Sequence, residues 1–250
     1  MKILLLGLAL VCVSIDASAK TVLITGSNRG LGFELASQYA ADGWTVIATA
    51  RTPDDDAELQ ALATQYASVR IAALDVTDHS QIDDLADELR GTAIEVLINN
   101  AGILGDPGAQ RLANLDFSAA EPLFATNTFG PLKIADAFLE HVEASKTKKI
   151  MNISSVVGSI SLANGNIYFY RASKTALNML MRNFAKDTAE RGIIVGMIHP
   201  GVIDTDMSAP FDIPKVSVEE SATGIRTVVD WYTSETSGTF MQYTGEPIAW

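Results

Sequence analysis

The fold is decided by the stretch Thr25-Gly26-Ser27-Asn28-Arg29-Gly30-Leu31-Gly32, which lies between a β-branched run at Thr21–Thr25 and a segment of helical period. A glycine-rich turn between a strand and a helix lets backbone amides approach a pyrophosphate closely, and the helix N-terminus adds partial positive charge. The spacing is G-x-x-x-G-x-G rather than the commoner G-x-G-x-x-G of dinucleotide-binding folds. The turn from Gly26 to Gly32 is therefore predicted to cradle a dinucleotide.

Short aliphatic or β-branched runs alternate with helical segments along the rest of the chain. This alternation is typical of βαβ units and of a parallel sheet covered by helices on both faces. We expect one doubly wound, three-layer α/β/α domain over residues 20–250, with about seven parallel strands. The strands are expected at Thr21–Thr25, Thr45–Thr49, Val69–Leu74, Glu95–Ile98, Lys149–Ile153, Ile193–Ile198 and Thr239–Gln242.

The helical segments show apolar residues at every third or fourth position, which predicts one buried stripe for each helix. Two such stripes are Leu59, Leu62, Ala63 and Tyr66, and Ile82, Leu85, Ala86 and Leu89. Asp78 and Ser217 are predicted to begin helices, because each is followed three residues later by a Gln or Glu that completes a capping pattern. The irregular segments 104–114 and 209–216 are expected to be loops.

Composition excludes several kinds of protein. Apolar residues make up 48% of the chain and charged residues 19%, enough for a large core. The net charge of -12 would repel phosphate backbones, so no nucleic-acid partner is expected. Cys12 is the single cysteine and cannot form an internal disulfide. No metal site is expected, because His79, His141 and His199 are far apart and lack companions at ligand spacing.

Residues 1–19 have the pattern of a cleavable signal peptide. Lys2 precedes an uncharged apolar run over residues 3–15, and Ala17-Ser18-Ala19 has the small-x-small form that a signal peptidase accepts. The run is shorter than the roughly 20 residues of a membrane-spanning helix, so no permanent span is expected. Cleavage would make this an exported protein. The alternative is a wrongly chosen start codon upstream of a cytoplasmic protein.

The end of the second predicted strand bears on the choice of dinucleotide. An acidic side chain near this point holds the adenosine ribose of NAD, whereas an arginine accommodates the 2′-phosphate of NADP. The strand ends Ala48-Thr49-Ala50-Arg51, without a carboxylate. Arg29 and Arg51 are expected to converge on that phosphate, so NADP(H) is favoured over NAD(H). The run Asp54–Asp56 follows Pro53 and is expected to open a helix instead.

Tyr170 and Lys174 are four residues apart and would share one face of a helix. Lowering the pKa of a tyrosine from about 10 to about 7 requires roughly 4 kcal/mol of preferential phenolate stabilisation. The Lys174 ammonium and an oxidised nicotinamide ring could supply it. Ser155 follows the strand Lys149–Ile153, and Asn100-Ala101-Gly102 follows the preceding strand, so both groups are expected at the carboxyl edge of the sheet, where ligands bind.

Taken in order, these motifs resemble the short-chain dehydrogenase/reductase family over Thr21–Trp250. The shared features are T-G-x-x-x-G-x-G, N-N-A-G at 99–102, a serine at a strand end, Y-x-x-x-K at 170–174, and His199-Pro200-Gly201. The run at 168–174 and the chain ending at 243–250 are also similar to the C-factor and Sniffer-like carbonyl reductases of that family. The resemblance implies a metal-free, NADP(H)-dependent reduction of an aldehyde or ketone to an alcohol.

The resemblance also implies individual roles. Tyr170 would protonate the carbonyl oxygen and act as the base in reverse, while Lys174 would bind the nicotinamide ribose and lower the pKa of Tyr170. Ser155 would hold the substrate oxygen; it is preferred to Ser154 because the family pattern is S-x-x-G. Asn127 would support a proton-relay water, unless it only bonds within its own helix. The residues assigned to the cofactor are Gly26, Ser27, Asn28, Arg29, Gly30, Leu31, Gly32, Arg51, Asp75, Val76, Asn100, Ala101, Gly102, Tyr170, Lys174, Pro200, Val202, Ile203 and Thr205.

Two alternatives remain open. The interval from Ser155 to Tyr170 is longer than is usual in the family, which makes Tyr168 a rival for the catalytic tyrosine. Tyr168 lies nearly opposite Lys174 around a helix, so it is expected to line the substrate pocket instead. The C-factor resemblance also suggests a signalling protein that binds a dinucleotide without turnover. Family members commonly form dimers or tetramers, and a homo-oligomer is a further expectation.

Overall fold

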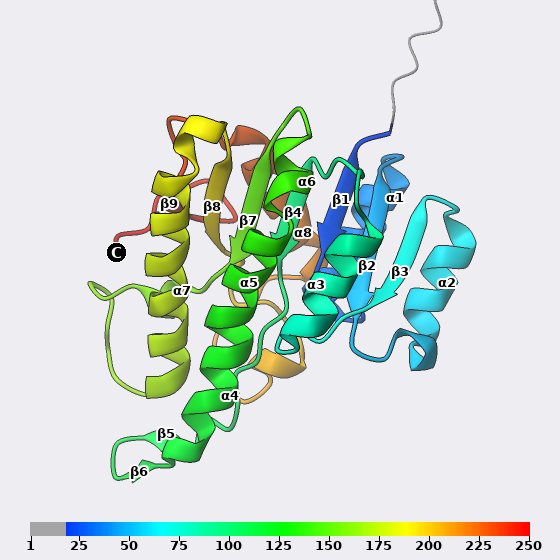
Figure 1. Cartoon of the computed structure of the whole chain (residues 1–250). Helices are drawn as coiled ribbons and strands as arrows, with labels where there is room; N and C mark the ends of the chain where they lie inside the picture. The colour runs from blue at the N-terminus through cyan, green and yellow to red at the C-terminus, as the bar shows by residue number, and fades with distance from the viewer. Residues whose placement is uncertain (1–18) are drawn as a thin grey trace, which may run out of the picture.

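The computed structural model describes residues 19–250 and has three layers, with a central sheet between two layers of helices (Figure 1). The sheet has seven strands, all parallel, in the order β3-β2-β1-β4-β7-β8-β9. They are β1 Thr21–Ile24, β2 Thr45–Ala50, β3 Val69–Ala73, β4 Val96–Asn99, β7 Lys149–Ile153, β8 Ile194–His199 and β9 Thr239–Gln242. The predicted doubly wound fold is confirmed, and no strand end differs from its prediction by more than one residue. The predicted leader, Ala19 excepted, lies outside the described residues.

Helices cover both faces of the sheet. The front layer in Figure 1 contains α3 His79–Glu88, α5 Gly130–Ala137 and α7 Tyr168–Asp187, with the short α4 Ala120–Phe124 and α6 Leu139–Glu143 on either side of α5. The other layer contains α1 Gly30–Ala41, α2 Ala57–Gln65 and α8 Val218–Trp231. α8 packs against α1, where the Arg226 guanidinium lies 4.7 Å from the centre of the Tyr39 ring and pairs with Asp42. The first and last long helices of the fold thus cover each other.

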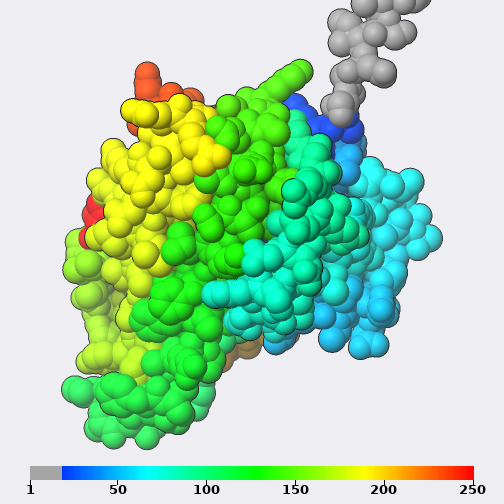
Figure 2. All heavy atoms as spheres, viewed as in Figure 1, coloured from blue at the N-terminus to red at the C-terminus, as the bar shows by residue number. Residues whose placement is uncertain are grey.

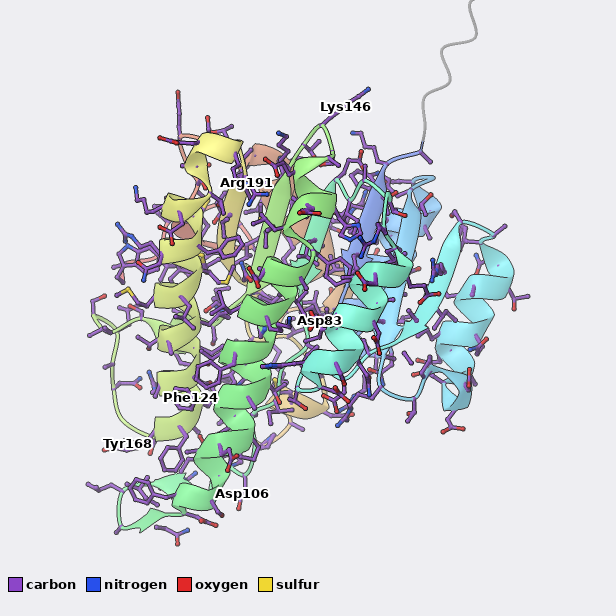
Figure 3. The ribbon with its side chains drawn as sticks, in the orientation of Figure 1. Asp83, Asp106, Phe124, Lys146, Tyr168 and Arg191 are labelled. Atoms are coloured by element: carbon purple, nitrogen blue, oxygen red, sulfur yellow. The ribbon has the colours of Figure 1, made fainter. Side chains whose placement is uncertain are left out.

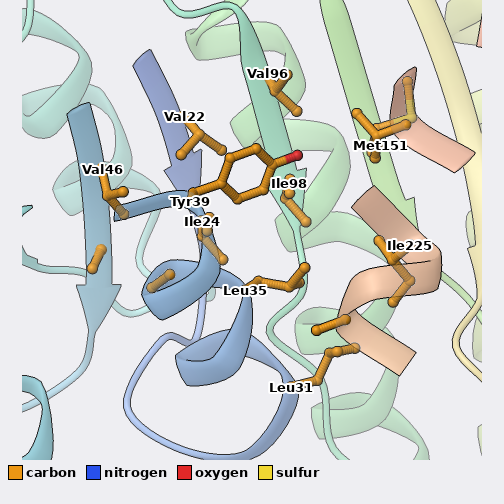
Figure 4. Close-up of a cluster of buried hydrophobic side chains, with 14 of the residues drawn as sticks. Val22, Ile24, Leu31, Leu35, Tyr39, Val46, Val96, Ile98, Met151 and Ile225 are labelled. Atoms are coloured by element: carbon orange, nitrogen blue, oxygen red, sulfur yellow. The ribbon is translucent and has the colours of Figure 1, made fainter. Parts of the chain in front are cut away.

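Successive side chains along each strand point to opposite faces of the sheet, so they contribute alternately to two hydrophobic cores. Val22 and Ile24 of β1 belong to the core under α1 and α8, shown in Figure 4, whereas Leu23 belongs to the core under α3, α5 and α7. Leu35 and Tyr39 of α1 pack on the same side as Val22. A parallel sheet that is buried on both faces follows directly from these near-continuous apolar strands.

The predicted helix signals are confirmed in detail. The Asp78 carboxylate accepts hydrogen bonds from the amides of Ser80 and Gln81 at the start of α3, and the Ser217 hydroxyl accepts one from the Glu220 amide at the start of α8. The stripe on α3 is fully buried. On α2 only Leu59 and Leu62 are buried; Ala63 is half-buried within the helix, and Tyr66 lies just after its end at Gln65.

A small hairpin over residues 110–115 overlaps the segment 104–114 that was expected to be a loop. β5 Gln110–Arg111 pairs antiparallel with β6 Asn114–Leu115. In Figure 2 this part of the chain forms the green lobe that projects at the lower left. The prediction missed it because strands of two residues are too short to show a period in the sequence.

Among residues 19–250, no helix has both the length and the apolar character that a bilayer crossing requires.

The interior of β8 leaves no room for a side chain at Gly196. An added methyl group would lie 2.6 Å from the Tyr232 ring and 2.7 Å from the Met151 sulfur. Overpacking of this kind typically costs about 1–3 kcal/mol. We therefore expect Gly196→Ala to lower the free energy of unfolding by this amount in urea titration, with the m-value unchanged. An unchanged midpoint would show that the core can expand here.

Candidate active site at the carboxyl edge of the sheet

The glycine-rich turn folds back tightly on the start of α1. Gly26 and Gly30 have φ angles of 68° and 54°, a region that glycine enters at little cost. A methyl group at Gly32 would lie 2.1 Å from the Gly26 carbonyl oxygen and 2.5 Å from Asn100 Nδ2. The turn therefore requires glycine at Gly32 for steric reasons, and the backbone is left open to solvent and to any ligand above it.

Thr25 and Asn100 tie the ends of β1 and β4 together. The Thr25 hydroxyl accepts hydrogen bonds of 3.0 Å from the amides of Asn100 and Ala101. In return, Asn100 Nδ2 donates to the carbonyl oxygens of Thr25 and Gly26 at 2.9 and 3.1 Å. The side chain of Asn100 thus fixes the shape of the glycine turn, and the predicted cofactor residues Ala101 and Gly102 follow it directly.

The N-terminus of α1 differs from those of α2, α3 and α8. Its N-cap residue, Arg29, provides no side-chain hydrogen bond, and its first turn carries no acidic residue. In contrast, Asp56, Asp78 and Ser217 cap α2, α3 and α8 with their side chains. Free amides at a helix start, beside a glycine turn without bulk, match the needs of a pyrophosphate. The residues present therefore fit a dinucleotide.

The two arginines expected to converge have different surroundings. Arg29 Nη1 lies 2.6 Å from the Asp206 carboxylate, in a short 3₁₀ turn after β8, and both side chains are exposed. Arg51 lines a hollow of about 700 Å³ with Gln60 and Ile71. Arg29 is thus held by Asp206, and its convergence with Arg51 on a 2′-phosphate stays a prediction. Exposed pairs of this kind contribute little stability, so an incoming phosphate can displace the carboxylate. Asp56 caps α2, as the sequence predicted for the acidic run.

Tyr170 and Lys174 lie in the first two turns of α7. Lys174 is buried, its Nζ donates a 2.9 Å hydrogen bond to the Ile153 carbonyl oxygen, and it lies 5.9 Å from the centre of the Tyr170 ring. Burial raises the pKa of Tyr170 to about 12, and a hydrogen bond from Ser155 to the phenolate acts in the opposite direction. Burial also lowers the pKa of Lys174 to about 8.

The pKa of Tyr170 is raised in the polypeptide by itself, and the expectation that Lys174 and an oxidised nicotinamide together lower it stays a prediction. The ammonium is directed at the Ile153 carbonyl, and the loss of water around the phenol outweighs every favourable contact. Any net lowering has to come from positive charge added by a bound molecule.

The two neighbouring serines have different partners. Ser154 is 2% exposed, and its hydroxyl donates a 2.6 Å hydrogen bond to Asn178 Oδ1. Ser155 begins a 3₁₀ turn over Val156–Gly158 and faces Tyr170. The geometry therefore favours Ser155 for contact with a substrate. At Gly158 an added methyl group would lie 3.0 Å from the backbone of Lys174, so α7 packs closely against this turn.

Asn127 lies in a short π-helical segment, Ala125–Phe129, that joins α4 to α5. Its amide exchanges two 2.8 Å hydrogen bonds with the backbone of Ile103 and donates a third, of 3.1 Å, to the Ser173 hydroxyl. These partners are distant in sequence, so the alternative that Asn127 only bonds within its own helix is wrong. A methyl group at Gly102 would lie 3.3 Å from Asn127 Oδ1 and 3.5 Å from Lys174 Nζ, which shows that these three residues converge.

The remaining predicted residues border the same edge. Thr205 begins the 3₁₀ turn after β8, and its methyl carbon would lie 3.4 Å from a methyl group at Gly30. Ile203 forms a parallel bridge with Val216. Val76 is buried, while Asp75 accepts hydrogen bonds from Thr77. Pro200 and Val202, which were also assigned to the cofactor, lie in the segment that follows β8.

Tyr168, the rival tyrosine, is the first residue of α7 and is 42% exposed. Figure 3 shows it at the end of α7 nearest the β5–β6 hairpin.

Two polar residues that were not predicted from the sequence stand out: Gln110, which contacts α7, and Asn178, within it. Gln110 is fully buried, its Oε1 accepts a 2.8 Å hydrogen bond from the Tyr170 amide, and its Nε2 donates to the carbonyl oxygen of Leu104. Nothing in a loop sequence distinguishes such a residue. Asn178 could have been found, because it is a polar residue within the apolar stripe of α7, one turn after Lys174. Within residues 19–250, no group of three or more His, Cys, Asp or Glu side chains could hold a metal ion.

Comparisons with known proteins agree with this geometry. Residues 20–214 match the model of a family described as short chain dehydrogenase. The C-signal protein of Myxococcus xanthus is 33% identical over 158 residues, which cover 63% of this chain and 93% of that protein. The NADPH-bound carbonyl reductase from chicken fatty liver is 34% identical, with a TM-score of 0.86, covering 93% of this chain and 99% of the other. The carbonyl reductase Sniffer of D. melanogaster is 28% identical, with a TM-score of 0.84 and coverage of 93% and 100%.

The link between β1 and β4 can be tested with valine, which keeps the shape of threonine but has no hydroxyl. Thr25→Val leaves the buried amides of Asn100 and Ala101 without their acceptor, which should lower the free energy of unfolding by about 1–3 kcal/mol. Thr21→Val, at the start of the same strand, removes a hydroxyl that makes none of the described hydrogen bonds and should have little effect. Equal unfolding midpoints in urea for the two variants would contradict the role given to Thr25.

Proposed function

The chain belongs to the short-chain dehydrogenase family, and from this premise we propose that it is an NADP(H)-dependent oxidoreductase that reduces an aldehyde or ketone to an alcohol. The observation that carries the proposal is the convergence of Tyr170, Ser155 and Lys174 at the edge where the glycine turn lies. One face of α7 and the end of β7 supply all three groups. No other described part of the chain places a phenol beside both a hydroxyl and a buried amine.

Tyr170 is suited to be the proton donor in the reducing direction. Burial keeps the pKa of its phenol high, so the group carries its proton throughout the physiological range. Ser155 donates a hydrogen bond to the same substrate oxygen as negative charge develops there. Bound NADPH would supply the hydride to the carbonyl carbon. The Lys174 ammonium, fixed by the Ile153 carbonyl, lies 5.9 Å from the centre of the Tyr170 ring.

The coenzyme would be held by the glycine turn after β1 and by the ends of β2 and β4. The first turn of α1 and Gly26–Gly32 offer backbone amides to the pyrophosphate, while Gly102 leaves space next to Lys174 and Asn127. Arg51 is exposed at the end of β2, with no carboxylate on that strand end. These features support NADP(H) rather than NAD(H), and the carbonyl reductase from chicken fatty liver is NADPH-bound.

A signalling protein without turnover is the alternative that the sequence left open, and the C-signal protein is among the relatives. Dinucleotide binding alone requires only the glycine turn and its neighbours. It does not require a phenol that faces a serine hydroxyl. Tyr170 and Ser155 therefore support an enzyme over a binding protein.

The central test removes one oxygen atom. Tyr170→Phe should lower kcat for NADPH-dependent reduction by about 10²–10⁴-fold, because a positioned general acid contributes about that much. The assay measures NADPH oxidation with a panel of aldehydes, ketones and quinones, and binding of NADPH should be unchanged. Tyr168→Phe is the matched control and should keep wild-type activity, since Tyr168 is exposed and lies on another side of α7.

Two results would refute this assignment. A wild-type protein that reduces no member of the panel would remove the enzymatic proposal. A Tyr170→Phe variant that turns over normally, or a Tyr168→Phe variant that loses activity instead, would remove the role of Tyr170.

Coenzyme choice has its own test. Arg51→Asp should weaken NADPH binding relative to NADH by about 1.5–3 kcal/mol, or roughly ten- to a hundredfold, because a charge-assisted contact with the 2′-phosphate is lost. Dissociation constants from NAD(P)H fluorescence give the ratio. Arg90→Asp makes the same charge change at an exposed position after α3 and should leave the ratio near the wild-type value. Equal ratios for both variants would refute the contact.

A further inference from the structure

The start of α7 is poorly fixed by its own sequence. Asn166 and Ile167 both have positive φ angles, of 60° and 39°, the N-cap residue Ile167 gives no side-chain hydrogen bond, and the first turn is held from outside by Gln110, which accepts from the Tyr170 amide. Residues 160–166 before it are exposed. Arg171 and Thr175 donate to the carbonyl oxygens of Val157 and Gly158 in the turn after Ser155. Contacts with the strand itself, further along the helix, add to these in setting the distance between Tyr170 and Ser155.

α7 has three such contacts with the end of β7, one on each of three successive turns. Tyr170 faces Ser155, Lys174 donates to the Ile153 carbonyl oxygen at 2.9 Å, and Asn178 accepts from the Ser154 hydroxyl at 2.6 Å. The third contact is between two side chains that are each 2% exposed. Ser154 immediately precedes Ser155. The bond between Ser154 and Asn178 therefore fixes α7 one residue away from Ser155, the hydroxyl that Tyr170 faces.

The Ser154–Asn178 pair is not the most stable way to fill this space. Asn178 Nδ2 is buried and has no hydrogen-bond partner among the described residues, and the same holds for Nδ1 of His199, in the neighbouring strand β8. A buried donor without an acceptor lowers stability, and apolar residues of similar volume would avoid that loss. In natural proteins, exceptions to the rule that buried polar groups are hydrogen-bonded are expected mainly at functional sites.

We propose that the Ser154–Asn178 hydrogen bond is a positioning contact that sets the register of α7 on β7 and thereby holds the Tyr170 hydroxyl against Ser155. The inference rests on the proposed function, because it gives this contact a role in proton transfer. Neither residue touches the substrate, since both are buried beneath the turn that carries Ser155. A displacement of about 1 Å at reacting groups can lower a rate by about 10²-fold, so a small slip of α7 is sufficient.

The decisive variant replaces both partners with apolar residues, as Ser154→Ala with Asn178→Leu. This change removes the unpaired amide together with its partner, so the unfolding temperature should be unchanged or higher. We expect kcat to fall by about ten- to a hundredfold while the dissociation constant for NADPH stays within twofold. Hydrogen exchange at the backbone amides of residues 168–174 should become faster, which reports the loosened helix without any need for turnover.

The control is Tyr232→Phe, which removes a buried hydroxyl that donates to the carbonyl oxygens of Met197 and Thr239, away from the site. It should lower the unfolding temperature and leave kcat unchanged. A purely structural role for Ser154 and Asn178 predicts the same behaviour for their double variant. Ser154→Thr, which keeps the hydroxyl, should restore kcat relative to Ser154→Ala.

A double variant with wild-type kcat and wild-type exchange at 168–174 would overturn the proposal. If the double variant does not fold, the single changes decide, and equal kcat values for Ser154→Ala and Ser154→Thr would overturn it. If the wild type reduces no carbonyl compound, the proposed function fails. The exchange measurement then still tests whether this bond fixes α7.

Discussion

The site depends on one topological constraint, the change of direction in the strand order on either side of β1. From β1 the chain builds outward through β2 and β3 on one side, then returns to place β4 on the other side. The connections after β1 and β4 therefore leave the sheet in opposite directions, which is the arrangement at which open α/β sheets bind ligands. The hydrogen bonds of Thr25 with Asn100 and Ala101 join the two strand ends at this point. The glycine turn and Gly102 follow these strand ends, and β7, next along the sheet, brings in Ser155.

The sequence was sufficient for features that follow from local chemistry. Apolar runs such as Val22–Ile24 mark strands buried on both faces, and Asp78 and Ser217 mark helix starts through short-range capping bonds. The order of the motifs along the chain also predicts that Tyr170, Lys174 and Ser155 lie at one edge of the sheet. Parallel topology explains this success, since all the strand ends that carry motifs lie at the same edge.

Other features depend on contacts that no local pattern records. Gln110 reaches the Tyr170 amide from a hairpin of two-residue strands, and the π-helical segment turns Asn127 toward Ile103. The raised pKa of Tyr170 was also not predicted, because neighbouring charges can be inferred from the sequence but the loss of water around the phenol cannot. Desolvation depends on every atom packed around the phenol, so spacing in the sequence carries no information about it. Arg29 found its partner in Asp206, far along the chain, for a similar reason.

The packing of α8 on α1 has a consequence for synthesis on the ribosome. Leu35 and Tyr39 of α1 are made early, but Ile225 and Arg226, which cover this side of the fold, belong to one of the last segments to emerge. For most of translation the nascent chain exposes an apolar helix face that has no partner. Surface of this kind makes incomplete chains prone to aggregation and is what holding chaperones bind. Premature termination before α8 would therefore yield a fragment that is prone to aggregation as well as incomplete.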